Sequence, residues 1–410
     1  MLPDETPRAR TGRAVVLVEN LSVPTDRRVW LETRALARAG WEMHVVCPTG
    51  VDRDLERHVE LEGVSIHRYP RREATGGPWG YVAEYGWALW HLRRAVRALL
   101  RRGPLDVVHL CNPPDVLFLA AGAARGRGAR LLFDHHDLVP ELYAARFGTG
   151  AGPLQRATRL AERLTFRRAD VVVSPNESYR RIALERGGKH PEDVFVVRMA
   201  PDPSRFRPVP PDPGLRRGKR HLLAYVGTIG PQDGVDHALR ALAALRRRRS
   251  DWHAVFAGRG DAVPGLRALV EELGLGDDVE LPGFLEDADV LRLLSTADVC
   301  LSPEPRNALN DASTMIKVTE YMALGRPIVA FDLTETRTTA GEAAIYAEPN
   351  DDGAYAAALE RLLDDPALRE ALGAEGRRRA AELSWERSEQ ALLAAYERAL
   401  GLGRRTRGRS

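Results

Sequence analysis

The 410-residue chain contains little cysteine and no excess of charge of either sign. Its 3 cysteines are too few for a disulfide framework and have no metal-ligand spacing, so a reducing compartment is expected. Basic residues outnumber acidic residues by only 60 to 57, which argues against nucleic acid as a partner. No apolar run reaches the roughly 18 residues of a membrane span, and residues 1–13 lack the apolar segment of a signal peptide. These absences predict a cytoplasmic globular protein.

The dinucleotide-binding fingerprint is also missing. That motif places three glycines, spaced G-x-G-x-x-G, directly after a strand. The chain offers Gly258-Arg259-Gly260 after an apolar run, but no third glycine follows at the required spacing. The sequence therefore argues against an NAD-dependent enzyme.

The chain does contain a regular alternation of short apolar strands and helices. In the first half, strands are predicted at residues 14–19, 43–47, 64–67, 106–110, 130–133, 170–174 and 194–198. In the second half, they are predicted at residues 222–227, 252–257, 279–281, 298–302, 327–331 and 344–346. This alternation is typical of doubly wound parallel sheets, whose ligands bind at the carboxyl ends of the strands. We therefore predict an α/β fold with two Rossmann-like domains that face each other across a cleft.

Prolines mark the boundary between the two halves. They cluster from Pro201 to Pro213, so residues 201–220 are predicted to link a domain at 1–200 to a domain at 221–383. A last helix at residues 384–400 is long enough to pack back across this linker, and residues 401–410 form a basic tail.

The stretch from residue 310 to 331 is predicted to be a helix followed by a buried strand. Its apolar residues recur at helical spacing and form one stripe: Met315, Val318, Thr319, Met322 and Ala323. Asp311 and Ser313 are residue types that cap helices, while Lys317 and Glu320 lie roughly opposite the stripe. The start of such a helix favours a phosphate group, which Lys317 could also contact. Alternatively, Lys317 and Glu320 form a solvated surface pair.

The run from Glu320 to Val329 (EYMALGRPIV) resembles the EAMA-x-G-x-P-V-V signature of family 4 retaining glycosyltransferases, which have the GT-B fold. The resemblance implies that Glu320 holds the ribose of a nucleotide donor. The family's other Glu, eight residues earlier, is replaced here by Ala312. The preceding N-D-x-S-T-M-x-K resembles one branch of the family, which implies donor-binding roles for Ser313, Thr314, Met315 and Lys317.

Glycines at two predicted strand ends extend this resemblance. The run from Gly227 to Gly234 (GTIGPQDG) stands where the family has G-R-L-x-x-x-K-G, with Thr228 and Asp233 replacing the two cations that hold the diphosphate. The resemblance implies donor contacts at Gly227, Thr228, Gly230 and Gly258, and it leaves Lys317 as the candidate catalytic cation. An ordinary tight turn is the alternative interpretation of Gly258.

Two loops in the first half resemble the family's acceptor side. Residues 133–141 resemble its D-x-H-D-x-x-P-E stretch, which implies that His136 lies beside the reacting carbon as a catalytic residue. Asp137 is expected to orient its neighbour or cap a helix. The loop at residues 20–29 resembles the family's D-x-R-V segment and adds Asn20, Asp26 and Arg28 as acceptor-side residues. The alternatives are a loop His-Asp pair without chemistry and a simple capped helix start.

Residues 79–102 join tryptophans to arginines on one predicted helix. Such a helix can lie at a membrane interface, so peripheral contact with the inner face of a membrane is one expectation. The alternative is a packed helix with a solvated basic edge.

Together these features predict an enzyme that transfers a sugar from a nucleotide diphosphate sugar to an acceptor hydroxyl, with retention of configuration. No metal or other cofactor is expected. The acceptor is unidentified and could be lipid-linked. The resemblance implies that the first domain binds the acceptor, that the second binds the donor, and that cleft closure excludes water. Two alternatives stay open at this point: a GT-B nucleotide-sugar epimerase and a non-catalytic subunit that binds sugar nucleotides.

Overall fold

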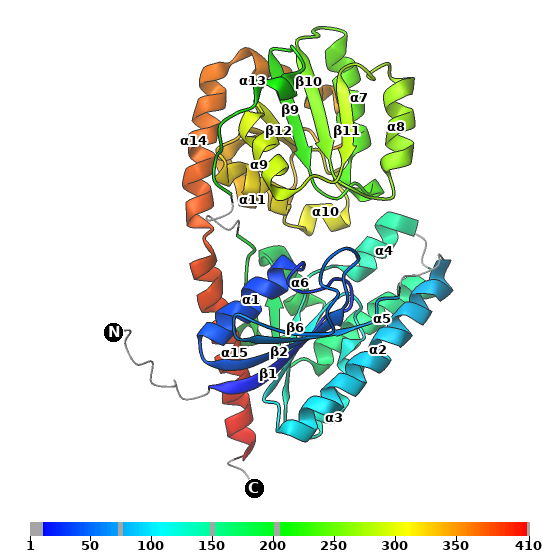
Figure 1. The fold of residues 1–410 in the computed structure, drawn as a ribbon, viewed down its shortest axis with the longest axis vertical. Coiled ribbons are helices and arrows are strands. Elements are labelled where there is room, and N and C mark those ends of the chain that lie inside the picture. Colours follow the sequence, from blue (N-terminus) through cyan, green and yellow to red (C-terminus); the bar gives the residue numbers. More distant parts are fainter. Residues whose placement is uncertain (1–10, 73–76, 148–151, 201–205, 408–410) are drawn as a thin grey trace. The chain divides into compact units, whose positions relative to one another are not determined.

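The computed structural model describes residues 11–72, 77–147, 152–200 and 206–407 (Figure 1). The chain divides into two compact units. The first unit comprises residues 1–144, 149–198 and 386–410, and the second comprises residues 145–148 and 199–385. Residues 201–205 of the predicted linker and residues 408–410 of the basic tail lie outside the described residues.

The first unit is built on one sheet, in the order β3-β4-β2-β1-β5-β6-β7-β8. Its strands are β1 Gly12–Leu17, β2 Trp41–Pro48, β3 His58–Leu61, β4 Val64–Tyr69, β5 Val107–Cys111, β6 Arg130–Asp134, β7 Val171–Ser174 and β8 Val194–Val196. Every pairing is parallel except that of β3 with β4. The main helices are α1 Arg27–Arg38, α2 Gly77–Arg102, α3 Gly122–Arg125, α4 Val139–Phe147, α5 Pro153–Arg168, α6 Glu177–Glu185 and α15 Trp385–Arg407.

The strand β3 was not predicted from the sequence. Three of its four residues are exposed, so it lacks the apolar run that marks the central strands. It pairs antiparallel with β4 through a two-residue turn, Glu62-Gly63, in which both residues have positive φ angles (48° and 80°). Such turns favour tight hairpins. The hairpin thus depends on its turn and not on a buried face.

The second unit is also built on one parallel sheet, in the order β11-β10-β9-β12-β13-β14. Its strands are β9 His221–Val226, β10 Trp252–Ala257, β11 Val279–Gly283, β12 Val299–Ser302, β13 Ile328–Phe331 and β14 Ala344–Ala347. The helices are α7 Val235–Arg246, α8 Val263–Glu272, α9 Asp287–Thr296, α10 Ala308–Ala312, α11 Ile316–Ala323, α12 Thr334–Ala340, α13 Asp352–Asp364 and α14 Pro366–Glu382. Apolar residues on both faces of the sheet are buried beneath these helices.

The described part of the proline-rich segment is docked onto the second unit. Phe206 is buried in the core of that unit. The Val209 backbone N–H donates to Ser295 Oγ at 3.0 Å, and the Asp212 N–H donates to Thr296 Oγ1 at 2.9 Å. From residue 206 onward the segment therefore belongs structurally to the second unit.

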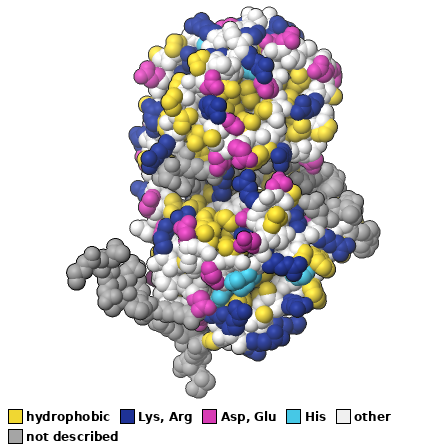
Figure 2. All heavy atoms as spheres, in the orientation of Figure 1, with side chains coloured by type: hydrophobic (Ala, Val, Ile, Leu, Met, Phe, Trp, Pro, Cys, Tyr) yellow, Lys and Arg dark blue, Asp and Glu magenta, His cyan; other side chains and the backbone are white. Residues whose placement is uncertain are grey.

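The prediction of an α/β fold with two parallel-sheet domains is confirmed. Residues 386–407 of the last helix belong to the first unit, where Tyr396 packs edge-on against Trp41 at 4.8 Å. Among the described residues, no helix combines the length and apolarity needed to cross a membrane. On the face shown in Figure 2, acidic and basic side chains are interspersed over each unit, consistent with the net charge of +3.

The predicted start of the helix in residues 310–331 is wrong. Two helices, α10 and α11, replace the single one, and neither Asp311 nor Ser313 caps α11. Asn307 caps α10 instead, by accepting from two backbone N–H groups. The Ser313 hydroxyl donates to Leu309 O at 2.7 Å, and Asp311 accepts from Thr334. Both predicted caps are thus committed to other partners.

Candidate functional site

One cluster of predicted site residues lies in the second unit, where Lys317 on α11 reaches the end of β9. Its ammonium donates to Glu304 Oε1 at 2.5 Å and to Tyr225 Oη at 2.8 Å. The same nitrogen lies 4.3 Å from the centre of the Tyr225 ring, and the Lys317 side chain is only 10% exposed. The expected alternative of a solvated Lys317–Glu320 pair is therefore wrong for Lys317, which pairs with Glu304 in the interior.

The turn after β9 leaves room for the lysine only because it begins with glycine. A Cβ atom built at Gly227 would lie 3.0 Å from Lys317 Cε and 3.3 Å from Nζ. The turn after β10 packs against the same segment, since a Cβ at Gly258 would lie 1.8 Å from Gly227 O. A side chain at either position would displace the lysine or the backbone. The structure thus brings Gly227, Gly258 and Lys317 together.

The rest of the glycine turn is closed by its own side chains. Asp233 accepts from the Gly230 N–H at 2.9 Å, and the Tyr225 hydroxyl donates to Thr228 O at 2.6 Å. The Thr228 side chain is exposed. Asp233 therefore fixes the turn from within, and Lys317 supplies positive charge beside it.

Burial and ion pairing act in opposite directions on Lys317. Burial lowers its pKa, but the charges of Glu304, Tyr225 and Asp233 and the hydrogen bond to Glu304 together outweigh burial and raise the pKa well above the ordinary value. Lys317 therefore stays charged throughout the working pH range. Glu304 is 1% exposed and also accepts from Ser302 Oγ at 2.5 Å. Glu304 and Tyr225 were both missed from the sequence; the only signal was their position at or near the carboxyl ends of β12 and β9.

The remaining predicted donor residues lie around the start of α11. Ser313, Thr314 and Met315 connect α10 to α11, and Met315 occupies the N-cap without a side-chain hydrogen bond. Glu320 lies one turn beyond the lysine and is half-buried. The connector is tied to the glycine turn through Asn310, which donates to Gln232 O at 2.9 Å. Predicted donor residues from three segments thus occupy one region of the second unit.

Another cluster of predicted site residues lies in the first unit, around Asp134 at the end of β6. His136 Nε2 lies 2.5 Å from Asp134 Oδ2. The Arg28 guanidinium donates to both carboxylate oxygens, at 2.8 and 3.2 Å, and it also lies 3.1 Å from Glu32. His109 Nε2 is 3.4 Å from Asp134 Oδ2, and its Nδ1 lies 3.0 Å from the Tyr396 hydroxyl. Asp134 is therefore a carboxylate that orients the His136 ring.

Asn112, directly after β5, holds the backbone of the histidine loop. Its side-chain oxygen accepts from the N–H groups of His136 (2.6 Å) and Asp137 (3.1 Å), and its amide donates to Asp137 O (2.7 Å). This contact depends on the parallel pairing of β5 with β6, in which Cys111 stands opposite Asp134. Asn112 was also missed, because its role arises from a neighbouring strand.

The buried charges around Asp134 balance one another. Burial alone would raise the Asp134 pKa, but the charges of Arg28 and His136 together with the hydrogen bonds from His109 and His136 outweigh it and hold the pKa well below its ordinary value. Burial raises the pKa of Glu32 well above its ordinary value, although Arg28 opposes the shift. Arg28 therefore serves chiefly as the counter-ion of Asp134.

The other predicted acceptor-side residues occupy the first loop. Asp26 is buried and caps α1 by accepting from the Val29 N–H at 3.1 Å. Asn20 lies half-exposed just beyond the end of β1. The loop is anchored by Asp54, which accepts from the hydroxyls of Ser22 (2.9 Å) and Thr25 (2.7 Å). Of the residues predicted here, Asn20 has the most open setting.

The first unit also contains a grouping of metal-ligand types that the sequence did not suggest. Ligand atoms of His109, Cys111 and Asp134, all buried, lie within 4.8 Å of one another. The guanidinium of Arg28 already bonds both Asp134 oxygens, and burial raises the pKa of the Cys111 thiol well above its ordinary value. A bound cation would have to displace a buried cation and compete for a protonated thiol. The residues fit a charge network better than a metal site.

Two α/β units, each built on a parallel or mostly parallel sheet with predicted site residues at the carboxyl ends of the strands, have the architecture of the GT-B fold. Residues 25–200 match the glycosyl transferase 4-like domain, and residues 211–379 match glycosyl transferases group 1. The chain belongs to the glycosyltransferases that these two domains define.

Similar proteins include the MMP alpha-(1->4)-mannosyltransferase of Mycolicibacterium hassiacum, 32% identical over 75% of this chain and 74% of that protein. Sucrose-phosphate synthase from Thermosynechococcus elongatus has a similar structure, with a TM-score of 0.72, 20% identity, and coverage of 97% and 99% of the two chains. Anabaena Alr3699/HepE in complex with UDP-glucose gives a TM-score of 0.70 at 16% identity, over 93% of this chain and 98% of that chain.

Proposed function

We propose that this enzyme moves a sugar from a nucleotide diphosphate sugar to a hydroxyl group of an acceptor, with retention of anomeric configuration. The observation that carries the proposal is the buried ammonium of Lys317 against the Gly227 turn. An ammonium has three N–H donors, and the contacts within the described residues use two of them, toward Glu304 and Tyr225. The third suits a phosphate oxygen. The UDP-glucose bound by the HepE protein supports a nucleotide-sugar donor.

In this proposal the second unit binds the donor. The diphosphate approaches the glycine turn and the start of α11, where backbone N–H groups and the helix dipole favour negative charge. Glu320, one turn further on, accepts hydrogen bonds from the ribose hydroxyls. As the bond from sugar to phosphate breaks, negative charge grows on the diphosphate beside Lys317. A cation fixed before the reaction stabilises that charge without reorganisation.

In the same proposal the first unit provides the acceptor side. Asp134 and Asn112 hold the ring and backbone of His136 in one orientation. The acceptor hydroxyl oxygen bonds to the sugar carbon on the face from which the diphosphate departs, the bond from that carbon to the phosphate oxygen breaks, and the hydroxyl proton passes to the departing phosphate oxygen. The proposal puts His136 beside the reacting carbon. No metal is required for this scheme, because Lys317 supplies the cation for the leaving group.

A donor screen tests the proposal. UDP-, GDP- and dTDP-sugars are compared by thermal shift, and one nucleotide class is expected to raise Tm, because a ligand that binds only the native state stabilises it by about 2.7 kcal/mol at 100 times its Kd. Turnover with an acceptor panel is then expected to survive a metal chelator. Donor binding without turnover on any acceptor would indicate a binding subunit, and conversion of the donor alone to an epimer would indicate an epimerase.

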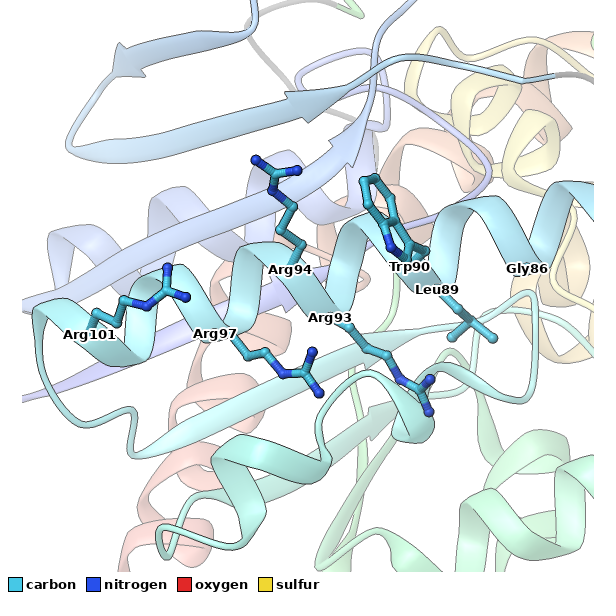
Figure 3. A pocket seen from close by; sticks show the side chains of 7 residues that line it. All are labelled: Gly86, Leu89, Trp90, Arg93, Arg94, Arg97 and Arg101. Atoms are coloured by element: carbon cyan, nitrogen blue, oxygen red, sulfur yellow. The ribbon is translucent and has the colours of Figure 1, made fainter.

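We further propose that α2 contacts a membrane surface. Trp90 is 53% exposed, and Arg94 lies over its ring at 5.6 Å. A groove of about 540 Å³ runs along this helix, lined by Leu89, Trp90 and four arginines (Figure 3). An exposed aromatic residue beside clustered arginines suits the interface of an anionic bilayer. The side chain of Trp79, part of the same prediction, lies outside the described residues.

Sedimentation with liposomes tests the membrane proposal. The protein is expected to pellet with anionic vesicles at low salt and to be released as salt rises, because screening weakens the attraction. Arg97→Glu with Arg101→Glu is expected to abolish pelleting. The matched control, Arg247→Glu with Arg248→Glu in the exposed turn directly after α7, is expected to pellet as wild type. Equal recovery in the supernatant with and without vesicles would contradict the proposal.

A further inference from the structure

A small cavity opens in the first unit at the carboxyl ends of β1, β2 and β4. It is lined by Glu19 and Asn20 after β1, Tyr69 and Arg71 at the end of β4, and Glu84 and Trp87 on α2. The space that a water-sized group could occupy is about 20 Å³. One water needs roughly 10–15 Å³ by the same kind of measure, so the cavity has room for a single small group. This edge of a parallel sheet is where ligands bind.

Glu19 lines this cavity and is largely buried. Its side chain belongs to a residue that is only 8% exposed, yet within the described residues no hydrogen bond or ion pair reaches its carboxylate. Two neighbouring donors are already used: the Trp87 indole N–H donates to Pro70 O at 2.9 Å, and the Tyr69 hydroxyl donates to Val18 O at 3.3 Å. A buried carboxylate without a partner costs free energy that a ligand could recover.

The charges around Glu19 favour a cation as that ligand. Burial raises the Glu19 pKa to about 8; repulsion by Glu84 adds to the rise and exceeds the opposing attraction to Arg71. Arg72 also lines the cavity, and the Tyr69 hydroxyl, whose own pKa is raised by burial, stays neutral. Because the second carboxylate outweighs the nearest arginine at Glu19, a positive group gains more here than a neutral hydroxyl.

We propose that this cavity receives a primary ammonium group of the acceptor, which donates hydrogen bonds to Glu19, so that the enzyme selects amine-bearing acceptors. The substrate class rests on the proposed function, whereas the ammonium site itself does not. A primary ammonium has the size of a water molecule and three donors. Such a group fits the volume of the cavity and can donate hydrogen bonds to the Glu19 carboxylate.

Titration of Glu19 tests the ammonium site without any donor or acceptor. In protein labelled at the glutamate carboxyl carbons, the Glu19 signal is assigned by its loss in Glu19→Gln. It is expected to titrate near pH 8 in the free protein. Methylammonium chloride should lower this midpoint, because the cation binds the ionised form. Tetramethylammonium chloride at the same ionic strength has no N–H and is too large, so it should not.

Two outcomes would overturn the site: equal effects of the two salts, or titration of Glu19 at its ordinary value of 4.5.

With a competent donor, wild type should prefer an amine-bearing acceptor over its hydroxyl counterpart by roughly tenfold to a hundredfold. Glu19→Gln should remove this preference and leave donor KM unchanged. Glu60→Gln, on the exposed hairpin, is the matched control. Unchanged preference in Glu19→Gln would overturn the substrate class, and failure of every donor would overturn the proposed function alone.

Discussion

Lys317→Ala is expected to lower kcat by roughly 10²-fold or more, because the lysine meets the leaving diphosphate where negative charge grows in the transition state. The same change should also destabilise the protein by about 3–5 kcal/mol, because it leaves the buried Glu304 carboxylate without its counter-ion. Steady-state kinetics well below Tm, together with the Tm itself, separate the two effects. Lys317→Arg should not restore kcat, since a planar fork replaces a point charge next to Gly227.

Two comparison variants assign the loss to the lysine charge. Glu304→Gln removes the charge that opposes burial of the ammonium but keeps an acceptor for it, so it should lower Tm and lower the Lys317 pKa, and kcat should then fall as the pH rises and the lysine loses its proton. Glu320→Ala removes contacts to the ribose, which does not change during the reaction. It should therefore raise KM by about ten- to a hundredfold, and this effect should be larger than the decrease in kcat. If Lys317→Ala loses stability but keeps wild-type kcat, the Lys317–Glu304 pair is purely structural and the donor site lies elsewhere.

His136→Ala is expected to lower turnover by roughly 10²-fold, the lower end of the range for a residue at the reacting centre, with little change in donor affinity. Turnover and donor affinity should respond differently because His136 lies in the first unit, which the proposal assigns to the acceptor side. The matched control is the neighbouring His135→Phe. His135 is fully buried among Phe133, Phe166 and Tyr179, and neither of its ring nitrogens has a hydrogen-bond partner within the described residues. Wild-type turnover in His136→Ala would make His136 a loop residue only.

The pH dependence of stability tests the network that holds His136. The Asp134 pKa lies below its ordinary value of 3.8, so its contribution to stability is fully present above pH 3.8 and is lost as the pH falls through the lower folded value. Asp134→Asn should remove this part of the acid transition. It should also lower stability at neutral pH, because Arg28 loses its main counter-ion. The measurement is urea unfolding of both proteins from neutral pH down to the acid limit.

The sequence alone was sufficient to predict the strands and the fold class. Residues 171–174 and 252–257 are apolar except for Ser174 and His253, and such short, mainly apolar runs are typical of strands buried on both faces of a sheet. The glycines after β9 and β10 were also predictable, because a tight strand end needs them wherever the rest of the chain lies. The failures were equally local: the exposed strand β3, and the helix start at residue 311, where Asn307 starts the separate helix α10, which ends at Ala312 before α11 begins at Ile316.

Only the tertiary structure decided which side chains act on one another. Lys317 pairs with Glu304 and Tyr225, and His136 with Asp134 and Asn112, because adjacent parallel strands end at the same edge of a sheet. Strand order and register set these pairings, and both depend on the packing of the whole unit. The same holds for Glu19, which at the end of an apolar strand resembles any other loop-edge carboxylate. Its burial and its lack of a partner follow from β4 and α2 closing over it, which no local pattern in the sequence encodes.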